Sequence, residues 1–275
     1  MANPFKELIK TLEFPFCYYA CMIDREGMID YFHYGLWETG AETIKEAQEN
    51  LASMMKSLIP AGVKRILDVG CGLGKTTCDL AFAGYDVLGI SPDVKLMEMA
   101  KLKHKECSSK LKISSFEDFQ SGEPFDLILF QESSQYIKDL RFLFSHCKQL
   151  LNKKGYILLC DEICYEKSEH CFYHEKNEML KIAGESGFKV IFNENITQKI
   201  LKTRELGLRF LVENKDSFIH EFSPLRKNAR QEIELMMEGW RIGSKLYDEH
   251  VFGYEGFLFQ MDNGHYMQHT PFSPI

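Results

Sequence analysis

The amino-acid sequence predicts an α/β fold in which a mostly parallel β-sheet carries helices on both faces. Between residues 65 and 162, short apolar runs alternate with helix-like stretches of about ten residues. Runs such as RILDV and FDLILF are continuously apolar, which is typical of strands buried on both faces of a parallel sheet. A composition of 45% hydrophobic and 13% aromatic residues over 275 positions supplies enough apolar surface for such a core.

The expected elements of the sheet follow one another in chain order. The last run, GYEGFLFQM, alternates only partly and contains two glycines, so we expect it to be an edge strand or an inserted antiparallel strand. Helices are expected at 75–83, after Ser91 and Pro92, at 138–151 and at 172–185. The seven expected strands are 65–69, 85–90, 111–114, 125–130, 156–162, 187–194 and 253–261.

Helical segments outside this alternation are predicted to form a cap. Residues 3–30 have a helical pattern, which 31–39 interrupt, and residues 197–247 are mainly helical. Between these segments lies an amphipathic helix that Pro60 and Gly62 end. Its apolar residues recur at spacings of three and four, which places them on one face: Ile44, Ala47, Leu51, Met54, Met55 and Leu58.

We therefore expect one domain over residues 1–275. The sequence contains no repeat and no Pro- or Ser-rich linker that would divide it. Its expected parts are an N-terminal helical cap at 1–60, a core at 61–196, a helical cap insertion at 197–250 and a last strand at 251–262.

Charge and cysteine content narrow the class of protein. With 33 Lys and Arg against 40 Asp and Glu, the chain has a net charge of −7 and no general basic field, which disfavours nucleic acid as a partner. The nine cysteines are scattered without a Cys-x-x-Cys pair, and we expect reduced thiols. No stretch has the roughly 18 apolar residues of a membrane span, and the N-terminus lacks the apolar region of a signal peptide. The expected location is cytoplasmic, with no membrane partner.

The segment LDVGCGLGKT, residues 67–76, combines a strand end, a glycine loop and a helix start. Glycines let the backbone turn tightly and approach a ligand closely. A P-loop would need glycine at Val69, and a dinucleotide-binding loop would need glycine at Lys75, so both spacings fail. The remaining pattern is Asp-x-Gly-x-Gly-x-Gly, from Asp68 to Gly74.

With this loop the sequence resembles the class I, Rossmann-like, S-adenosylmethionine-dependent methyltransferases that act on small molecules. It is similar to the group of cyclopropane-fatty-acid synthases, tocopherol methyltransferases and sarcosine/glycine N-methyltransferases. The resemblance covers roughly residues 31–260 and includes YFHYGLW, the segment from FDLILF to YILLCDE, AGESGFKV and GYEGFLF. It implies a seven-stranded Rossmann-like sheet with a helical cap. The implied cofactor is S-adenosylmethionine, with S-adenosylhomocysteine as product.

The resemblance assigns the first half of a cofactor site. The backbone of Gly70, Gly72 and Gly74 would lie under the methionine part of the cofactor. Asp68 would orient the loop and the cofactor's amino group, although an Asp before such a turn is equally often only a turn former. Cys71 would contact the cofactor as a small side chain rather than as a nucleophile. From the segment YFHYGLW, Tyr34 would cover the cofactor.

The same resemblance assigns the ribose and adenine ends. The acidic residue that often ends the second strand is absent, and Ser91 could supply a hydroxyl or simply cap the following helix. Ser115 and Phe116 match the residues near adenine, with Phe116 also a candidate for the core. Glu132, which ends the fourth strand, would stand between the cofactor and acceptor pockets.

Two absent motifs favour a small-molecule acceptor. The residues after the fourth strand, Gln131 to Ser134, lack the Asn/Asp-Pro-Pro-Tyr/Phe motif of enzymes that methylate amide and adenine nitrogens. No Pro-Cys pair of a C5-cytosine enzyme occurs either. Aromatic side chains can surround a cationic amine through their π-faces, which makes an amine one candidate, but ordinary packing explains them equally well. The candidate acceptor residues are Tyr31, His33, Tyr34, Trp37, Tyr136 and Asp161.

His33 and Tyr136 are the candidate catalytic residues. A histidine with a pKa near neutrality can act as a general base, although a lone histidine is more often structural. Cys164, His170, Cys171 and His174 suggest a metal site, but their spacing matches no closed site, and we expect no metal.

The sequence thus predicts methyl transfer from S-adenosylmethionine to N, O or C of a small metabolite. The alternative is a catalytically inactive relative that binds the cofactor as a sensor or scaffold. The acceptor atom and the oligomeric state stay open.

Overall fold

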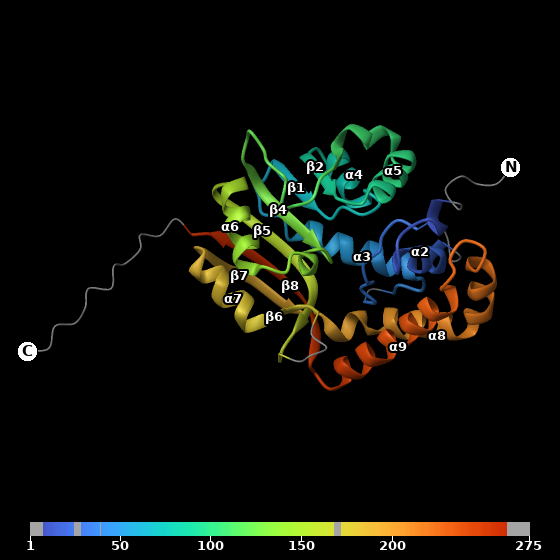
Figure 1. The fold of residues 1–275 in the computed structure, drawn as a ribbon. Coiled ribbons are helices and arrows are strands. Elements are labelled where there is room, and N and C mark those ends of the chain that lie inside the picture. The colour runs from blue at the N-terminus through green and yellow to red at the C-terminus, as the bar shows by residue number, and fades with distance from the viewer. Residues whose placement is uncertain (1–7, 25–28, 39, 168–171, 263–275) are drawn as a thin grey trace, which may run out of the picture.

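The computed structural model describes residues 8–24, 29–38, 40–167 and 172–262. Within these ranges one mixed sheet has the strand order β3-β2-β1-β4-β5-β8-β7, and the short β6 also pairs with β5 (Figure 1). All the predicted strands are present, within five residues of the expected bounds. The strands are β1 (Arg65–Val69), β2 (Asp86–Ser91), β3 (Leu111–Ile113), β4 (Phe125–Gln131), β5 (Leu151–Cys164), β6 (His174–Glu175), β7 (Phe188–Asn195) and β8 (Phe252–Met261).

The sheet is parallel except for β8, which is inserted between β5 and β7 and runs antiparallel to both. The last strand is therefore an inserted strand and not an edge strand. Because β8 runs in the opposite direction, its first residues lie at the carboxyl ends of the parallel strands, and Tyr254 pairs with Glu162 of β5. This insertion brings the C-terminal part of the chain to the edge where open α/β sheets bind ligands.

The helices follow the predicted order, with three differences in their bounds. Within the described part of 3–30, residues 8–10 and 16–24 are helical and residues 11–15 interrupt them. The helix expected at 172–185 begins at Lys176, directly after β6. The helix after β2 begins at Val94, one residue after Asp93. The Asp93 side chain accepts a hydrogen bond from the Leu96 amide at 3.0 Å, so Asp93 and not Ser91 is the N-cap of this helix. The helices are α2 (Phe16–Asp24), α3 (Ile44–Ser57), α4 (Lys75–Phe82), α5 (Val94–Lys103), α6 (Leu140–Leu150), α7 (Lys176–Glu185), α8 (Thr197–Phe222) and α9 (Ala229–Asp248), with 3₁₀ turns η1 (Lys105–Lys110) and η2 (Ser134–Tyr136).

Helices cover both faces of the sheet. On one face, α6 and α7 pack through Phe144 and Met179 against Phe130 and Phe257 of the strands. On the other face, α3 and α4 contribute Leu51, Met55 and Leu80 to a core that also contains Leu158 of β5. The amphipathic helix at 44–57 thus covers the sheet, and its core also includes Ile200 of α8 and Tyr247 of α9.

The cap consists of α2, α8 and α9, which lie together beyond the edge of the sheet (Figure 1). Its core is built from Tyr18 of α2, Phe218 and Phe222 of α8, and Trp240 of α9. Leu73 of the glycine loop and α5 belong to the same core. Packing of the cap therefore reaches the loop that the sequence assigns to the cofactor.

The helices α8 and α9 are long, with 26 and 20 residues, but they contain charged residues throughout. In the ranges that the structure describes, no helix combines the length and the apolar composition needed to cross a bilayer.

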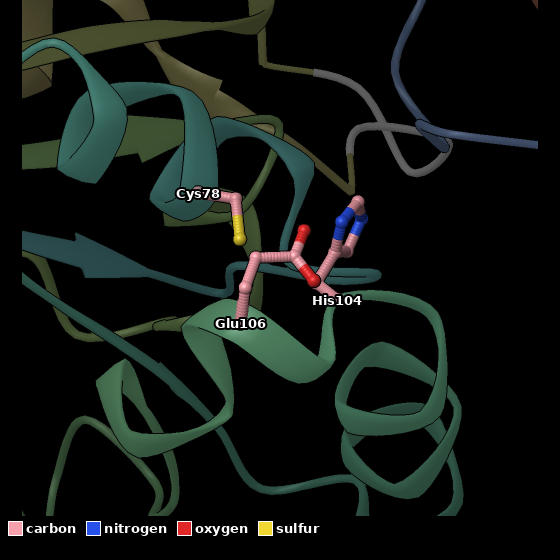
Figure 2. Close-up of side chains that lie close together, drawn as sticks. All are labelled: Cys78, His104 and Glu106. Carbon is pink, nitrogen blue, oxygen red and sulfur yellow. The ribbon is translucent and has the colours of Figure 1, made fainter.

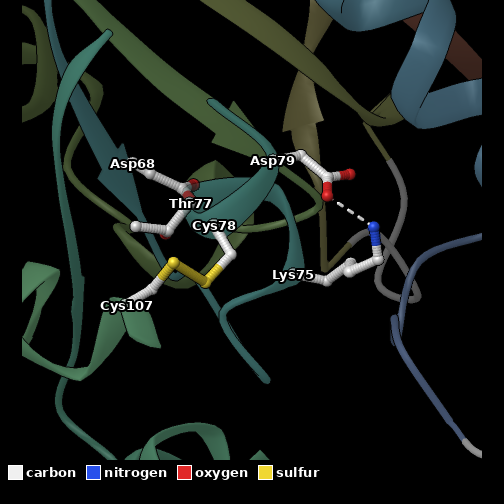
Figure 3. Close-up of a disulfide and its surroundings, with 6 residues drawn as sticks. All are labelled: Asp68, Lys75, Thr77, Cys78, Asp79 and Cys107. Carbon is white, nitrogen blue, oxygen red and sulfur yellow. Dashed lines mark hydrogen bonds and ion pairs between the residues drawn. A yellow bond between two sulfur atoms is a disulfide. The ribbon is translucent and has the colours of Figure 1, made fainter. Parts of the chain in front are cut away.

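The cysteines do not all stay reduced, as the sequence suggested. Cys78 of α4 and Cys107 of η1 form a disulfide with a Cα–Cα distance of 5.7 Å, which Figure 3 shows beside Thr77 and Asp68. Cys164 is also disulfide-bonded. The free thiols among the described residues are Cys17, Cys21, Cys71, Cys147 and Cys160. The sequence gave no sign of the Cys78–Cys107 bond, because the two residues are 29 positions apart and only the fold brings α4 and η1 together.

We predict that the crossing of α8 and α9 depends on Gly207. A Cβ at Gly207 would overlap the Trp240 ring, so Gly207→Ala should lower the free energy of unfolding by about 1–3 kcal/mol. Gly239→Ala in α9 is the matched control, because nothing lies within 4 Å of its Cβ position, and it should stabilise by about 0.5–1 kcal/mol. Urea denaturation of both variants gives the comparison, and equal effects would contradict the packing argument.

Candidate active site

One large cavity lies between the carboxyl ends of the parallel strands and the cap. Its volume is about 1140 Å³, more than the roughly 300–1,000 Å³ of a site for one small ligand. The glycine loop and the ends of β2 and β4 form one side, and residues of α2, α8 and α9 form the other. The cavity has room for a cofactor and a second molecule.

The three predicted glycines of the loop all require glycine's conformational freedom. Gly70, Gly72 and Gly74 have φ of +71°, +52° and +77°. A Cβ at Gly70 would overlap Ser133, which holds the loop close to the end of β4. At Gly72 a Cβ would meet nothing nearer than Phe32 at 3.6 Å, so this glycine presents open backbone to the cavity. The loop therefore offers a bare surface followed by the N-terminus of α4.

The buried Asp68 side chain, at the start of this loop, is hydrogen-bonded to α4. The carboxylate is 2% exposed and accepts a hydrogen bond from the Thr77 hydroxyl at 2.6 Å. Burial raises the pKa of Asp68 to about 6, although the Thr77 bond opposes the shift. The Thr77 bond thus fixes the Asp68 side chain between β1 and α4, and the cavity also reaches Asp68.

Cys71 lines the cavity, and its Sγ lies 3.8 Å from the Met97 sulfur. Burial raises the pKa of this thiol well above its usual value, so the sulfur stays protonated at neutral pH. This agrees with a contact role and not with a nucleophilic one.

At the end of β2, Ser91 is buried and lines the cavity. Asp93, two residues further on, also lines it and uses Oδ1 to cap α5. The second strand therefore has a carboxylate near its end after all, displaced by two positions from the expected place. The sequence pattern hid it because Asp93 follows Pro92 and looks like part of the helix start.

Near the expected adenine end, Phe116 lies between the core and the cavity. It belongs to the core against Phe130 and also lines the cavity. Ser115 does not line the cavity, since its hydroxyl donates to Asp118 at 2.7 Å in a local turn. Its neighbours Ser114 and Glu117 line the cavity instead.

Glu132 stands at the end of β4 with φ of +52°, a conformation that is unusual for a residue other than glycine. Its Oε1 accepts hydrogen bonds from the Tyr34 amide and the Tyr254 hydroxyl, both at 2.6 Å. Burial and the nearby Glu162 charge raise the pKa of Glu132 well above its usual value. Strain of this kind persists where surrounding contacts fix it, often at functional sites.

A second set of polar contacts surrounds the Tyr34 side chain. Its hydroxyl lies 3.2 Å from Glu162 Oε1 and is also bonded to Arg204 of α8. Tyr247 of α9 donates to the same Glu162 oxygen at 2.8 Å, and Arg204 forms an ion pair with Glu162 at 3.6 Å. Tyr34 thus lies in the cavity wall between the sheet and the cap, where it can contact both cofactor and acceptor.

His33 is buried, and the structure corrects its expected pKa. Its Nδ1 donates to the Tyr34 carbonyl at 2.7 Å, and burial lowers the pKa of the ring to about 4. His33 is therefore neutral at pH 7 and a weaker base than the sequence suggested. Its Nε2 has no hydrogen-bond partner among the described residues and lies in the cavity wall, so it can accept a bond from a ligand.

The other acceptor candidates separate into two groups. Tyr31 lines the cavity, and Tyr136 in η2 is 62% exposed at its rim. Asp161 is fully buried beneath η2, where it accepts bonds from the Ser134 amide and hydroxyl, and Trp37 donates to Thr203 of α8. Neither Asp161 nor Trp37 is among the cavity-lining residues.

Several buried polar atoms in the cavity wall lack a partner. Buried polar atoms in folded proteins are nearly always paired, so such a group in one wall indicates a ligand-binding surface. Arg204 Nε and Gln131 Nε2 are unpaired donors, and Gln135 Oε1 is an unpaired acceptor like His33 Nε2. An amino-acid nucleoside such as S-adenosylmethionine, with carboxylate, amine, hydroxyl and adenine groups, fits this donor and acceptor set and the bare glycine loop.

The sequence did not single out Glu162, Arg204 and Tyr254. Glu162 could have been found, because it ends the fifth strand at the ligand-binding edge. Tyr254 required knowing that the last strand is inserted antiparallel. Arg204 lies in a long helix whose sequence gives no sign of its position.

The metal hypothesis for the segment at 164–174 finds no support in the described part of the segment. His174 Nε2 lies 2.9 Å from the Ser134 carbonyl, and Cys164 is disulfide-bonded. His170 and Cys171 lie outside the described residues.

Comparison with known proteins shows what the chain is similar to. Residues 67–159, from β1 to β5, match the family described as a methyltransferase domain. This part of the chain, about a third of its length, is similar to methyltransferase domains. Phosphoethanolamine N-methyltransferase 1 from Triticum aestivum is 25% identical to the chain over 217 residues, 73% of this chain and 41% of that protein. The chain spans about two fifths of the length of the curated relatives it matches, 40–42% for three of them.

Solved structures of methyltransferase-like proteins show the same fold. A putative sarcosine dimethylglycine methyltransferase from Galdieria sulphuraria has a TM-score of 0.72 at 16% identity, covering 85% of this chain and 93% of that one. A cyclopropane synthase from Mycobacterium tuberculosis also has a TM-score of 0.72 at 16% identity, covering 94% and 99%. The Rossmann-like fold and the resemblance predicted from the sequence are confirmed.

We predict that this chain needs glycine at position 72 for cofactor binding. In Gly72→Ala the added methyl group lies in the cavity, and affinity for S-adenosylmethionine should fall at least about tenfold, or about 1.4 kcal/mol. Gly84→Ala is the matched control, because Gly84 also has a positive φ, +95°, with open space around it, but lies outside the cavity. Calorimetry with S-adenosylhomocysteine measures both; unchanged affinity in Gly72→Ala would refute the loop assignment.

We also predict a pH dependence of cofactor affinity that comes from Asp68. With a pKa of about 6, the carboxyl is mostly protonated at pH 5 and mostly ionised at pH 7. A cationic amino group binds the ionised form better, so affinity should rise up to about tenfold from pH 5 to 7 and then level off. Calorimetry across this range should show the rise in the native chain and a flat profile in Asp68→Asn. If the affinity of the native chain does not change between pH 5 and 7, Asp68 does not bind the cofactor's amino group.

Proposed function

We propose that this chain methylates a small molecule with S-adenosylmethionine as the methyl donor, and that the acceptor atom is an amine nitrogen. The observation that carries the proposal is the single cavity that runs from the bare glycine loop to the Glu132 carboxylate under the cap. When bound, the cofactor supplies an electrophilic methyl group on sulfur. The protein has to align an acceptor with it and to exclude water.

The arrangement of groups in the cavity supports the amine. Glu132 and Glu162 place two carboxyl groups in the wall, and the rings of Tyr34, Tyr136 and Phe32 line the space around them. Carboxylates and aromatic faces both attract an ammonium group. Relatives with amine acceptors in their names, the phosphoethanolamine and sarcosine enzymes, agree with this choice.

Glu132 is the residue best suited to take a proton from the acceptor. An ammonium group has no lone pair and must lose a proton before its nitrogen can attack. Because burial raises the pKa of Glu132, proton transfer from an ammonium to this carboxylate costs less free energy than transfer to an ordinary one. His33, with its pKa lowered to about 4, is the weaker base and fits better as a hydrogen-bond acceptor that orients a ligand.

Apolar side chains of the cap close the other side. Met236, Trp240 and Leu246 of α9 and Met22 of α2 line the cavity opposite the strand ends. These residues exclude water from the reacting groups, and they determine which acceptors fit. The cap, and not the cofactor loop, therefore sets substrate choice in this proposal.

The test is turnover of S-adenosylmethionine with amines and with alcohols of the same shape. We expect S-adenosylhomocysteine to form with amines, and kcat for the best amine to fall about 100-fold in Glu132→Gln with cofactor affinity unchanged within about threefold. Glu255→Gln is the control, because Glu255 is fully buried in β8 but bonds to Lys176 and does not line the cavity.

Each contrary result has a distinct meaning. Turnover with alcohols alone would overturn the amine assignment. Cofactor binding without turnover of any acceptor would overturn catalysis and support an inactive sensor or scaffold. An unchanged kcat in Glu132→Gln would remove this residue from proton transfer.

A further inference from the structure

Four side chains with metal-binding chemistry meet outside the cavity. Cys78 of α4, His104 at the end of α5 and Glu106 of η1 each bring one ligand atom to within 4.8 Å of the others. Cys107 joins the group through its bond to Cys78. Figure 2 shows the Glu106 carboxylate between the Cys78 sulfur and the His104 ring. None of the four residues lines the large cavity, so the cluster is separate from the proposed methyl-transfer site.

His104 provides a second, independent observation. The side chain is only 8% exposed, and its Nε2 has no hydrogen-bond partner among the described residues. A buried imidazole nitrogen without a partner is rare and indicates a missing ligand. A neutral imidazole is the commonest metal ligand in proteins, and zinc is bound by imidazole and cysteine sulfur together.

We propose that reduction of the Cys78–Cys107 disulfide opens a zinc site formed by Cys78, Cys107, His104 and Glu106. A dithiol reductant gives two electrons and two protons to the disulfide and itself becomes a disulfide. Zn²⁺ then binds both sulfurs as thiolates, and their two protons pass to solvent. Because each sulfur is either bonded to the other sulfur or bound to the metal, disulfide and zinc exclude each other.

The backbone already suits four-coordinate zinc. With Zn–S distances of about 2.3 Å, two cysteine sulfurs on one tetrahedral ion lie about 3.8 Å apart, close to the contact distance of two separate sulfur atoms. Reduced Cys78 and Cys107, with a Cα–Cα distance of 5.7 Å, can reach this separation by side-chain rotation. In a 3₁₀ turn, side chains three positions apart lie on one face, which brings His104 and Cys107 to the same side.

Two thiolates, an imidazole and a carboxylate would fill all four positions of a tetrahedral zinc and leave none open, as structural and not catalytic sites do. Either link, disulfide or zinc, joins α4 to η1. Thr77, next to Cys78, holds Asp68 of the glycine loop (Figure 3). The cluster thus links α4, the helix that begins at the cofactor loop, to η1. In the oxidised chain the disulfide makes this link, and in the reduced chain the zinc ion makes it.

The experiment measures zinc bound to the full chain before and after reduction with a phosphine that has no thiol. We expect about one zinc per reduced chain by elemental analysis after desalting, and none per oxidised chain. Cobalt(II) added to the reduced chain should give thiolate charge-transfer and tetrahedral absorption bands. These readouts do not depend on methyl transfer, so the proposal can fail while the proposed function holds, and the reverse.

Matched variants locate the metal. His104→Ala should weaken zinc binding at least tenfold, whereas His146→Ala should not, although His146 is equally buried at 8% exposure and bonds to the Phe119 carbonyl. Glu106→Gln tests the site without a risk to folding, because Glu106 is exposed; it should weaken zinc about tenfold, with Glu98→Gln on α5 as its control.

Two results would overturn the proposal. One is a reduced chain that binds no zinc at micromolar concentration. The other is zinc that stays bound when Cys78 and Cys107 are both replaced by serine, since the metal would then lie elsewhere.

Discussion

The hydrogen bonds to Glu132 hold the candidate site together. One carboxylate oxygen at the end of β4 accepts from the Tyr34 amide and from the Tyr254 hydroxyl. These donors come from the segment before α3 and from the last strand, about 100 and 120 residues away in the chain. The left-handed backbone of Glu132 is tolerated because these contacts define where its side chain must point. Three distant parts of the sequence are thereby fixed around one acidic group at the ligand-binding edge of the sheet.

Insertion of β8 makes this convergence possible. An eighth parallel strand would bring its carboxyl end to this edge and would need a long crossover before it. The antiparallel strand instead starts at the edge, directly after α9, so Tyr254 arrives beside Glu162 with only three residues between helix and strand. The cap helices α8 and α9 occupy the connection between β7 and β8. Sheet topology alone therefore places the cap over the carboxyl ends of the strands.

The features that could be predicted from the sequence are those that depend on a few neighbouring residues. Strands with continuous apolar runs, the loop from Asp68 to Gly74 and the aromatic residues before α3 were recognisable, because backbone conformation and burial there follow from a few adjacent positions. Arg204, Tyr254 and the Cys78–Cys107 pair were not, since each depends on contacts between elements far apart in the chain. Asp93 was missed for a different reason: its capping role hid a carboxylate that also reaches the cavity.

Shared packing links the cap to the cofactor loop. Leu73 lies between Gly72 and Gly74, yet its side chain is buried in the cap core with Trp240 and Phe218. In the proposed function, a ligand that orders the loop would therefore also act on the cap, and an acceptor held under the cap would act on the loop. Such coupling is reciprocal by thermodynamic necessity. The apolar contact of Leu73 thus gives the chain a physical route by which cofactor binding prepares the acceptor side of the cavity.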